Sequence, residues 1–533
     1  MKKYILILQI SVLASIGLSS CQDKGKEGAA TQEEVAPAQS EEEVAYRPIF
    51  HFTPDSGWMN DPNGMFYLDG TYHLFFQHNP DDNVWGPMHW GHATSTDLIT
   101  WEEQPIALEP DKHGTIFSGS AVVDHNNTSG LGEGDIPPVI AIFTYHDAEA
   151  ADAGRDDFQT QGIAYSLDKG KTWIKYDQNP VLGNPGIRDF RDPKVEWFEE
   201  EQKWIMSLAV QDHISFYSSL NLLEWEHESD FGQNLGGHGG VWECPDLFKM
   251  TVEETGEEKW VLLVSINPGG PNGGSATQYF IGDFDGTTFT PHESIAEIGE
   301  EHDYWIDFGK DNYAGVTWSN IPESDGRRLF IGWMSNWEYA NEVPTEQWRS
   351  SMTIPRTLKL NKEGSTYRIL SSPVQELKQY YSTGVDQKEI VVQDSTILAG
   401  EDINLSKAVL SFDISNLQEQ RYEFTLGNSE GDQLIFGYSG IEKEFFLNRG
   451  NSGLTEFKDV FGKEVSTAPR LSNAESLNVK IVLDKTSIEI FYDNGKTVMT
   501  EIFFPNELFQ TITADGEQNF TIENFQINQL NFN

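Results

Sequence analysis

Cysteines, long apolar runs and basic residues are all scarce in this chain. Its 533 residues include only two cysteines, Cys21 and Cys244, which excludes a framework of several disulfides. The apolar run from Tyr4 to Gly17 is too short for a membrane-spanning helix. Against 84 acidic residues there are 36 basic ones, a formal charge of −48 that repels nucleic acid and anionic membrane surfaces. A neutral glycan feels no such repulsion.

Signals for a metal or a phosphate site are also missing. His89 and His238 belong to no recurring metal-ligand spacing, so we expect no metal and no other cofactor. The run Gly236-Gly237-His238-Gly239-Gly240 lacks a following helix and a Lys-Ser/Thr pair, so it is not a phosphate-binding loop.

The N-terminus predicts export. Lys2-Lys3 and the apolar run after them have the charge and length of a secretory signal. Leu18-Ser19-Ser20-Cys21 resembles a bacterial lipobox, which predicts a signal peptide over residues 1–20 and a lipid on Cys21 that anchors the protein to a membrane, at its periplasmic or outer face. An ordinary signal peptide with an incidental cysteine is the alternative. Residues 21–46 are polar and predict a flexible tether.

The rest of the chain predicts an all-β fold. Hydrophobic residues make up 38% and aromatic residues 12%, which is ample core material. Short alternating strands broken by Gly, Asn, Asp and Pro dominate residues 47–355, with hardly any helical periodicity. Runs at Ser95-Thr96-Asp97, Ser166-Leu167-Asp168 and Ser218-Ser219-Leu220-Asn221 each precede a tryptophan and read as strand, polar turn and return strand, which is typical of propeller blades. We expect their Asp and Asn residues to cap turns.

Three acidic residues stand in settings that favour chemistry. Asp61 lies in the turn-forming run Trp58-Met59-Asn60-Asp61-Pro62-Asn63-Gly64. Asp192 precedes another proline, with Arg191 beside it to keep it ionised. Glu243 follows an indole in a run without a basic neighbour, and apolar surroundings raise a carboxyl pKa. One charged carboxylate and one proton carrier are what glycoside hydrolysis requires.

These three segments, in this order, resemble glycoside hydrolase family 32, the β-fructofuranosidases that include invertases, exo-inulinases and levanases. The likeness spans residues 47–533. Further matching runs are Gln77-His78-Asn79-Pro80, Trp85-Gly86-Pro87-Met88-His89-Trp90-Gly91-His92, Phe117-Ser118-Gly119-Ser120, Asn267-Pro268-Gly269-Gly270-Pro271-Asn272-Gly273-Gly274 and Gly332-Trp333-Met334-Ser335-Asn336-Trp337.

The resemblance implies a fold and a reaction. The fold would be a five-bladed β-propeller over residues 47–355, a connector over 356–378 and a C-terminal β-sandwich over 379–533. In retaining hydrolysis of a β-fructofuranoside, Asp61 would be the nucleophile, Glu243 the acid and base, and Asp192 the stabiliser of the transition state.

The resemblance also implies which residues hold the sugar. Asn60 and Gln77 would offer amides, Ser118 a hydroxyl, and Arg191 would orient Asp192. Trp85, Phe117 and Trp333 would form the apolar walls, although a tryptophan such as Trp333 could equally pack between blades. Asp303 and Trp305 are further candidates. Cys244, next to the acid, would either modulate it or be a small buried filler.

Several functions remain open at this point. The Asp61 and Trp85 runs favour an exo-acting enzyme that releases fructose from inulin, levan and sucrose, with an endo-levanase or a dedicated sucrose hydrolase as alternatives. A sialidase-like propeller is suggested by the run from Ser166 to Trp173, but only Arg188 and Arg191 accompany the acids. A non-catalytic glycan-binding lipoprotein is the last alternative, and the intact set of acids argues against it. Linkage preference and oligomeric state have no readable motif.

Overall fold

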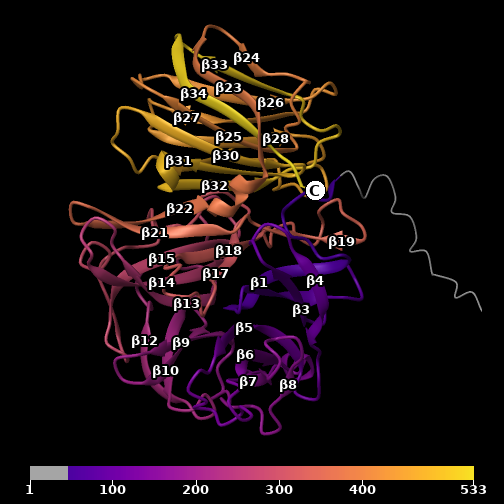
Figure 1. The fold of residues 1–533 in the computed structure, drawn as a ribbon, viewed down its shortest axis with the longest axis vertical. Coiled ribbons are helices and arrows are strands. Elements are labelled where there is room, and N and C mark those ends of the chain that lie inside the picture. The colour runs from indigo at the N-terminus through magenta and orange to yellow at the C-terminus, as the bar shows by residue number, and fades with distance from the viewer. Residues whose placement is uncertain (1–45, 533) are drawn as a thin grey trace, which may run out of the picture. The chain divides into compact units, whose positions relative to one another are not determined.

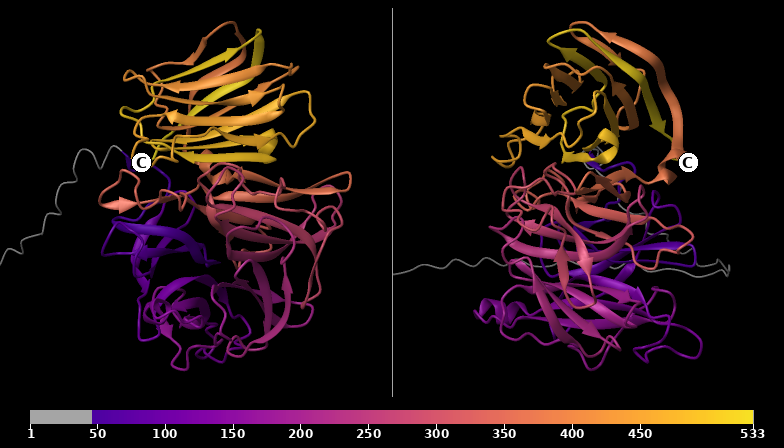
Figure 2. Two further views of the ribbon diagram at one scale, coloured as in Figure 1. Left: turned by 180° about the vertical axis from the view of Figure 1, so that it is seen from behind. Right: turned by 90° about the vertical axis from the view of Figure 1, so that its left-hand side faces the viewer.

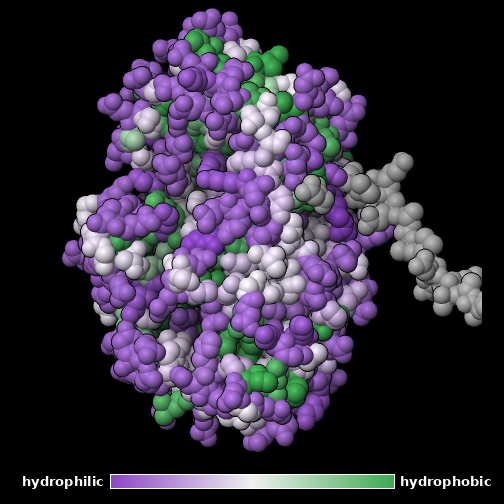
Figure 3. Space-filling model, viewed as in Figure 1, coloured by the Kyte–Doolittle hydropathy of each residue, from purple (hydrophilic) through white to green (hydrophobic). Residues whose placement is uncertain are grey.

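The computed structural model describes residues 46–532, and nearly all of its regular elements are β-strands. The predicted signal peptide, Cys21 and all but the last residue of the predicted tether lie outside these residues. Within 46–532, no helix combines the length and apolarity needed to cross a membrane. The face drawn in Figure 3 is mostly hydrophilic, with apolar residues in small groups.

Five small, mainly antiparallel sheets form the first part of the described chain (Figure 1). The first contains β1 (Gly57–Leu68), β2 (Thr71–Asn79), β3 (His89–Ser95), β4 (Glu102–Leu108) and β19 (Trp348–Arg349). The second contains β5 (Thr115–Val123), β6 (Val139–His146), β7 (Gln159–Ser166) and β8 (Ile174–Lys175), with the helix α2 (Ala148–Asp152) between β6 and β7. The third contains β9 (Phe190–Phe198), β10 (Lys203–Val210), β11 (His213–Ser219) and β12 (Glu226–Phe231).

The last two sheets complete the series. The fourth contains β13 (Val241–Thr251), β14 (Glu258–Asn267), β15 (Ala276–Phe284) and β16 (Phe289–Pro291). The fifth contains β17 (Tyr313–Thr317), β18 (Arg328–Met334), β20 (Ser351–Met352), β21 (Arg356–Glu363) and β22 (Thr366–Pro373). Residues 356–373 were predicted to belong to a connector. They instead complete the fifth sheet, because β21 pairs with β18.

The five sheets are the blades of a β-propeller. The first strands of the sheets, β1, β5, β9, β13 and β17, contact one another in sequence, and β17 contacts β1, so the ring closes. Middle strands such as β6 and β10 are buried on both faces, which explains their continuous apolar sequences. The predicted five-bladed propeller is confirmed.

The predicted turn caps are also confirmed. Asp97 accepts hydrogen bonds from the backbone N–H groups of Ile99 and Thr100, and Asn221 does the same for the two residues that follow Leu222. Asp168 accepts from the backbone of Thr172. These polar residues hold turns between strands and lie away from the catalytic acids.

Two six-stranded sheets stack face to face as a C-terminal β-sandwich (Figure 2). A short 3-10 helix, η1 (Gln375–Tyr380), leads into it. One sheet contains β23 (Tyr381–Val392), β34 (Phe520–Leu530), β25 (Lys407–Ile414), β30 (Leu477–Asp484), β31 (Ser487–Tyr492) and β32 (Thr497–Ile502), with η2 (Asp493–Gly495) between β31 and β32. The other contains β24 (Thr396–Ala399), β33 (Thr511–Gly516), β26 (Arg421–Gly427), β27 (Gln433–Ser439), β28 (Glu444–Asn451) and β29 (Ser466–Pro469).

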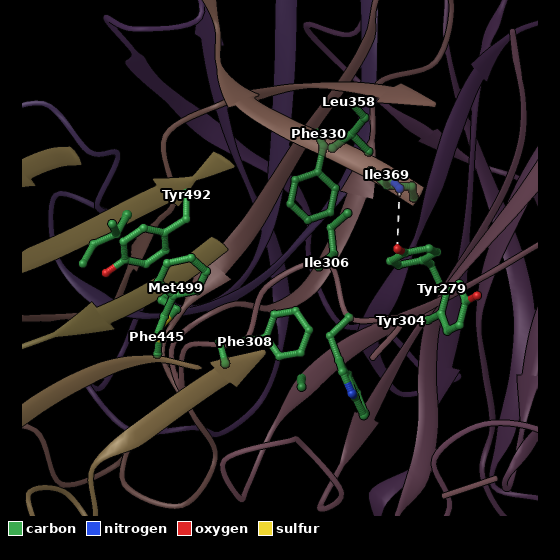
Figure 4. Close-up of a cluster of buried hydrophobic side chains, with 14 of the residues drawn as sticks. Tyr279, Tyr304, Ile306, Phe308, Phe330, Leu358, Ile369, Phe445, Tyr492 and Met499 are labelled. Carbon is green, nitrogen blue, oxygen red and sulfur yellow. Dashed lines mark hydrogen bonds between the residues drawn. The ribbon is translucent and has the colours of Figure 1, made fainter. Parts of the chain in front are cut away.

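Apolar packing joins the sandwich to the propeller. One continuous buried cluster includes Tyr279 and Phe330 from the fourth and fifth blades and Phe445 and Met499 from the sandwich (Figure 4). Phe308, in the segment before β17, belongs to the same cluster. Burial of a side chain of this size contributes about 1.5–3 kcal/mol.

A buried charge network crosses the same region. Arg356 of β21 forms ion pairs with Asp307 and with Glu489 of β31, and all three side chains are fully buried. Glu489 also accepts from His51, whose other ring nitrogen contacts Asp484 at 2.9 Å. The start of the described chain, the fifth blade and the sandwich are therefore held by one set of mutually compensating charges.

His51 gives this network a pH dependence. Burial lowers the pKa of His51, but its hydrogen bonds to Asp484 and Glu489 outweigh burial and raise the pKa to about 9. The folded state thus keeps a proton that the unfolded state releases near pH 6.5. The stabilisation is complete below that pH and is lost as the pH rises towards 9.

We expect the stabilising contribution of His51 to fall by about 3 kcal/mol between pH 6.5 and 9. The measurement is the free energy of unfolding of the wild type minus that of His51→Gln, by denaturant titration across this range. The subtraction cancels all groups that titrate alike in both proteins. A difference that stays constant with pH would contradict a protonated His51.

Candidate active site

Every inner strand of the propeller carries a β-bulge at the same end of the ring. The bulges fall at Asn60-Asp61, Phe117-Ser118, Asp192-Pro193, Cys244-Pro245 and Ala314-Gly315. A bulge redirects a side chain that regular pleating would turn away. Bulges in five neighbouring strands therefore concentrate polar side chains at one mouth of the central channel.

Local sequence explains several of these bulges. Pro62, Pro193 and Pro245 cannot donate a ladder hydrogen bond; Pro193 and Pro245 lie within their bulges, and Pro62 directly follows one. Asp192 and Cys244 have φ angles of 63° and 45°, in the left-handed region that few residues other than glycine adopt. The strain at Asp192 is held by buried contacts, since its N–H donates to Thr144 Oγ1.

Asp61 is fixed by donors on both of its carboxylate oxygens. Oδ1 accepts from Asn60 Nδ2 at 2.9 Å, and Oδ2 accepts from Ser118 Oγ at 2.8 Å. Asn60 is itself oriented by the indole N–H of Trp58, at 2.7 Å. Burial and then the charge of Glu243 raise the pKa of Asp61, while the two hydrogen bonds oppose the rise. The Asp61 carboxylate is thus held in one orientation and partly desolvated.

Glu243 faces the same space from β13. Its Oε1 accepts from Arg191 Nη2 at 2.8 Å and from Nε at 3.1 Å, and its Oε2 accepts from the Tyr313 hydroxyl. The prediction that Glu243 has no basic neighbour is wrong, because Arg191 donates to it. The prediction that Trp242 forms an apolar wall beside it is also wrong, because side chains alternate along β13 and Trp242 points to the other side, where its N–H donates to the carbonyl of Gly237.

Asp192 also differs from its predicted setting. The Arg191 guanidinium donates its hydrogen bonds to Glu243 and to Asp189, whereas its Nε lies 4.0 Å from Asp192 Oδ2. Burial raises the pKa of Asp192 to about 7; the charge of Arg191 opposes the shift, and those of Glu243 and Asp61 add to it. The sequence predicted that Arg191 would keep Asp192 ionised. That prediction is not met, because Arg191 does not hold Asp192 firmly in the charged form.

Cys244 lies between two of the acids. Its Sγ is 3.6 Å from Asp61 Oδ2 and 3.7 Å from Asp192 Oδ2, and its backbone N–H donates to Asp192 at 3.1 Å. Burial and then the surrounding carboxylates raise the pKa of the thiol well above its usual value. Cys244 is thus a neutral spacer that touches both carboxylates, which favours a role at the acids over that of a mere filler.

A cavity of about 510 Å³ opens above the acids. Nine of the ten predicted catalytic and binding residues line it: Asn60, Asp61, Gln77, Trp85, Phe117, Ser118, Arg191, Asp192 and Glu243. Within the described residues, the buried amide nitrogen of Gln77 has no hydrogen-bond partner. A buried donor without a partner is costly, so a ligand hydroxyl at this position would be favoured.

Trp333 is the predicted residue that does not line the cavity. It is fully buried and packs against Trp58 and Trp337, with ring centroids 6.0 and 5.0 Å away. Trp337 lines the cavity in its place. The chain leaves β18 after Met334, so strand alternation no longer governs Trp337 and it reaches the pocket. Asp303 and Trp305 are also absent from the lining, since Asp303 pairs with Arg368.

Apart from Arg188, noted above as a cation near the acids, the other lining residues had no separate signal in the sequence. His146, Ala151, Phe158, Gln159 and Arg188 form the wall beside α2. This wall depends on the β6–β7 connection, which carries no motif. Asn267 and Trp337 lie in runs that match the family, but nothing in those runs marks which residue points inward.

Comparison with known proteins places this geometry in a family. Residues 51–373 match the model described as "Glycosyl hydrolases family 32 N-terminal domain", and residues 376–529 match "Glycosyl hydrolases family 32 C terminal". A levanase of Bacillus subtilis (strain 168) is 46% identical over 464 residues, covering 86% of this chain and 67% of the relative. An extracellular exo-inulinase of Aspergillus niger is 39% identical over 491 residues, covering 86% of this chain and 90% of the relative.

A solved structure agrees with the sequence matches. The crystal structure of an exo-inulinase from Aspergillus awamori is 35% identical and superposes with a TM-score of 0.83, covering 91% of this chain and 98% of that one.

Proposed function

This chain belongs to glycoside hydrolase family 32, and from that premise we propose that it is a fructan β-fructosidase, which releases terminal β-D-fructofuranosyl residues from inulin or levan and from sucrose. The observation that carries the proposal is the cavity where Asp61, Asp192 and Glu243 meet. Relatives named levanase and exo-inulinase support the substrate class. A sialidase-like reaction is disfavoured, because among residues 46–532 only Arg188 and Arg191 line this cavity as cations.

The proposed reaction proceeds in two steps with retention of configuration. Asp61 attacks the anomeric C2 of fructose while the carboxylic acid of Glu243 gives its proton to the departing oxygen, which leaves a fructosyl ester on Asp61. Glu243 then takes a proton from water as that water attacks C2 and frees Asp61. Arg191 and Tyr313, which hold the two oxygens of Glu243, fix the direction of both proton transfers.

Asp192 takes a supporting part in the proposal. Its carboxylate binds ring hydroxyls and, when ionised, stabilises the positive charge that develops on the sugar in the transition state. Asn60, Gln77 and Ser118 complete the polar side of the pocket. Trp85 and Phe117, whose rings meet edge to face with centroids 6.1 Å apart, form the apolar side.

The products of early hydrolysis test this function. A pocket closed by Trp85 and Phe117 admits one terminal fructose and leaves the rest of the chain outside. We therefore expect free fructose from inulin or levan at low conversion, and cleavage of sucrose, by chromatography of the products. Trp85→Ala should weaken fructose binding. A ladder of oligosaccharides with little monomer would contradict the exo pocket and favour an endo-levanase.

Anchoring is a separate proposal. The extracellular exo-inulinase among the relatives supports export, and the lipobox-like run that ends at Cys21 supports a lipid on that residue. The acyl chains would hold the protein at the membrane, since a charge of −48 is repelled by anionic lipids.

We expect Cys21→Ala to move the protein from the membrane fraction to the soluble fraction, as measured by immunoblotting after a salt wash. Cys244→Ser is the matched control, because it changes the other cysteine and should leave the protein with the membranes. Retention of Cys21→Ala in washed membranes would refute the lipid anchor.

A further inference from the structure

A second and larger cavity lies at the opposite end of the propeller channel. Its volume is about 780 Å³, against about 510 Å³ for the cavity at the acids. Val123, Glu196 and Met250, from the last parts of β5, β9 and β13, line it together with Trp318, which follows β17. The catalytic acids lie in the first halves of their strands, so the two cavities open at opposite mouths.

Buried polar contacts close the channel between the two cavities. Lys194 Nζ lies 3.1 Å from Asp246 Oδ2 and donates to the carbonyl of Thr317 at 2.7 Å. Thr317 in turn donates to Asp246 through its backbone N–H and its hydroxyl. All three residues are buried. The second cavity shares no lining residue with the first, so a molecule in one does not occupy the other.

Two half-buried charges in the second cavity have no hydrogen-bonded protein partner, although burial raises the pKa of Glu196 and the charge of Arg328 opposes that rise. Neither the Glu196 carboxylate nor the Arg328 guanidinium has a hydrogen bond or an ion pair within residues 46–532, although Arg328 lies over the ring of Phe248, 4.6 Å from its centroid. The other half-buried charges of the lining are paired, Lys249 with Glu200 and Arg327 with Asp325. Glu196 and Arg328 are therefore an acceptor and a donor whose hydrogen-bonding groups make no hydrogen bond within residues 46–532 and can offer one to a ligand.

Indole rings form the apolar part of the lining. Trp197, Trp204 and Trp318 all line the cavity, but Trp204 and Trp318 are buried, so the half-buried Trp197 offers the open indole surface. Each indole N–H is already bonded, to Glu199, to Thr128 and to the carbonyl of His73. The rings are thus held in place. A sugar offers hydroxyls to a carboxylate and a guanidinium and a C–H face to the half-buried indole of Trp197, so this lining suits a saccharide. The charge of −48 disfavours an anionic one.

We propose that this cavity is a second, non-catalytic site that binds a neutral oligosaccharide, with Arg328 donating to its hydroxyls and Glu196 accepting from them. The identification of that oligosaccharide as a fructan rests on the proposed function. A polymer held at this site would keep its other ends near the enzyme, which raises the local concentration of chain ends at the acids.

The test uses the full chain with Asp61→Asn, which prevents turnover, titrated with fructo-oligosaccharides by calorimetry. We expect two binding sites per chain. Adding Arg328→Gln or Glu196→Gln should weaken one site about tenfold or more, as expected for loss of a hydrogen bond to a charged group, and leave the other unchanged. Adding Arg421→Gln, at an exposed arginine of the sandwich, is the matched control and should change neither site.

Kinetics with the active enzyme separate this inference from the proposed function. In Arg328→Gln and Glu196→Gln, we expect KM for polymeric fructan to rise several-fold while kcat and the kcat/KM for sucrose stay as in the wild type. A single binding site with unchanged affinity in both variants would overturn the second site, even if fructan is hydrolysed. Failure of the wild type to hydrolyse fructan or sucrose would instead refute the proposed function.

Discussion

Asp61→Asn should lower turnover on fructan by about 10³-fold or more, because an amide cannot form the fructosyl ester. Asn60 and Ser118, which now hold the carboxylate, can still bond the new side chain, so the fold should be kept. Steady-state release of fructose measures the loss, and thermal unfolding checks the fold. Asp55→Asn makes the same change at an exposed aspartate and should leave turnover as it is.

Glu243→Gln separates the two proposed roles. Turnover on fructan should also fall steeply, because the leaving oxygen receives no proton. A fructoside whose leaving group departs without protonation should recover much of the first chemical step in Glu243→Gln and none of it in Asp61→Asn, as measured by the first-turnover release of that group. Near-wild-type turnover on fructan in either variant would show that the roles are wrongly assigned.

The identity of the site could be predicted from local sequence. Asp61, Asp192 and Glu243 each lie next to a proline or one residue from it, and the structure shows that these prolines mark β-bulges in inner strands. A bulge is a local event, so its residues leave a local signature. The blade turns at Asp97 and Asp168 are local as well, and they too could be predicted.

Interactions between blades could not be predicted in this way. The partner of Arg191 is Glu243, 52 positions away, and Tyr313 reaches Glu243 from 70 positions away. Adjacent positions in the sequence suggested instead that Arg191 contacts Asp192 and that Trp242 forms an apolar wall beside Glu243. Such contacts form only when the blades close into a ring, and no short stretch of sequence signals how the ring closes.

The ends of the propeller were hard to place for a similar reason. Polar and apolar residues alternate over residues 356–373, as in many exposed strands. Of this segment, β21 pairs with β18 and β22 with β21, after a long stretch of chain that contains β19 and β20. The parallel pairing of β19 with β1 links the first blade to the same excursion. The length of the connector thus depended on contacts that are distant in the sequence.

The charge network around Arg356 should have a large effect on stability. Arg356→Met would leave Asp307 and Glu489 buried without their shared cation, and breaking a buried ion pair in this way costs about 3–5 kcal/mol. The free energy of unfolding, from denaturant titration, measures the loss. Arg155→Met removes an exposed pair with Asp157, which solvent screens, and should leave stability nearly unchanged.

The same experiment can also neutralise the two carboxylates, Asp307 and Glu489. If the loss of their shared cation is the cause, the further changes Asp307→Asn and Glu489→Gln in the Arg356→Met background should recover part of the lost stability, because neutral amides are cheaper to bury than ions. Residual hydrogen bonds to Thr500 and Ile354 remain available to these side chains. An Arg356→Met protein as stable as the Arg155→Met control would mean that apolar packing alone joins the fifth blade to the sandwich.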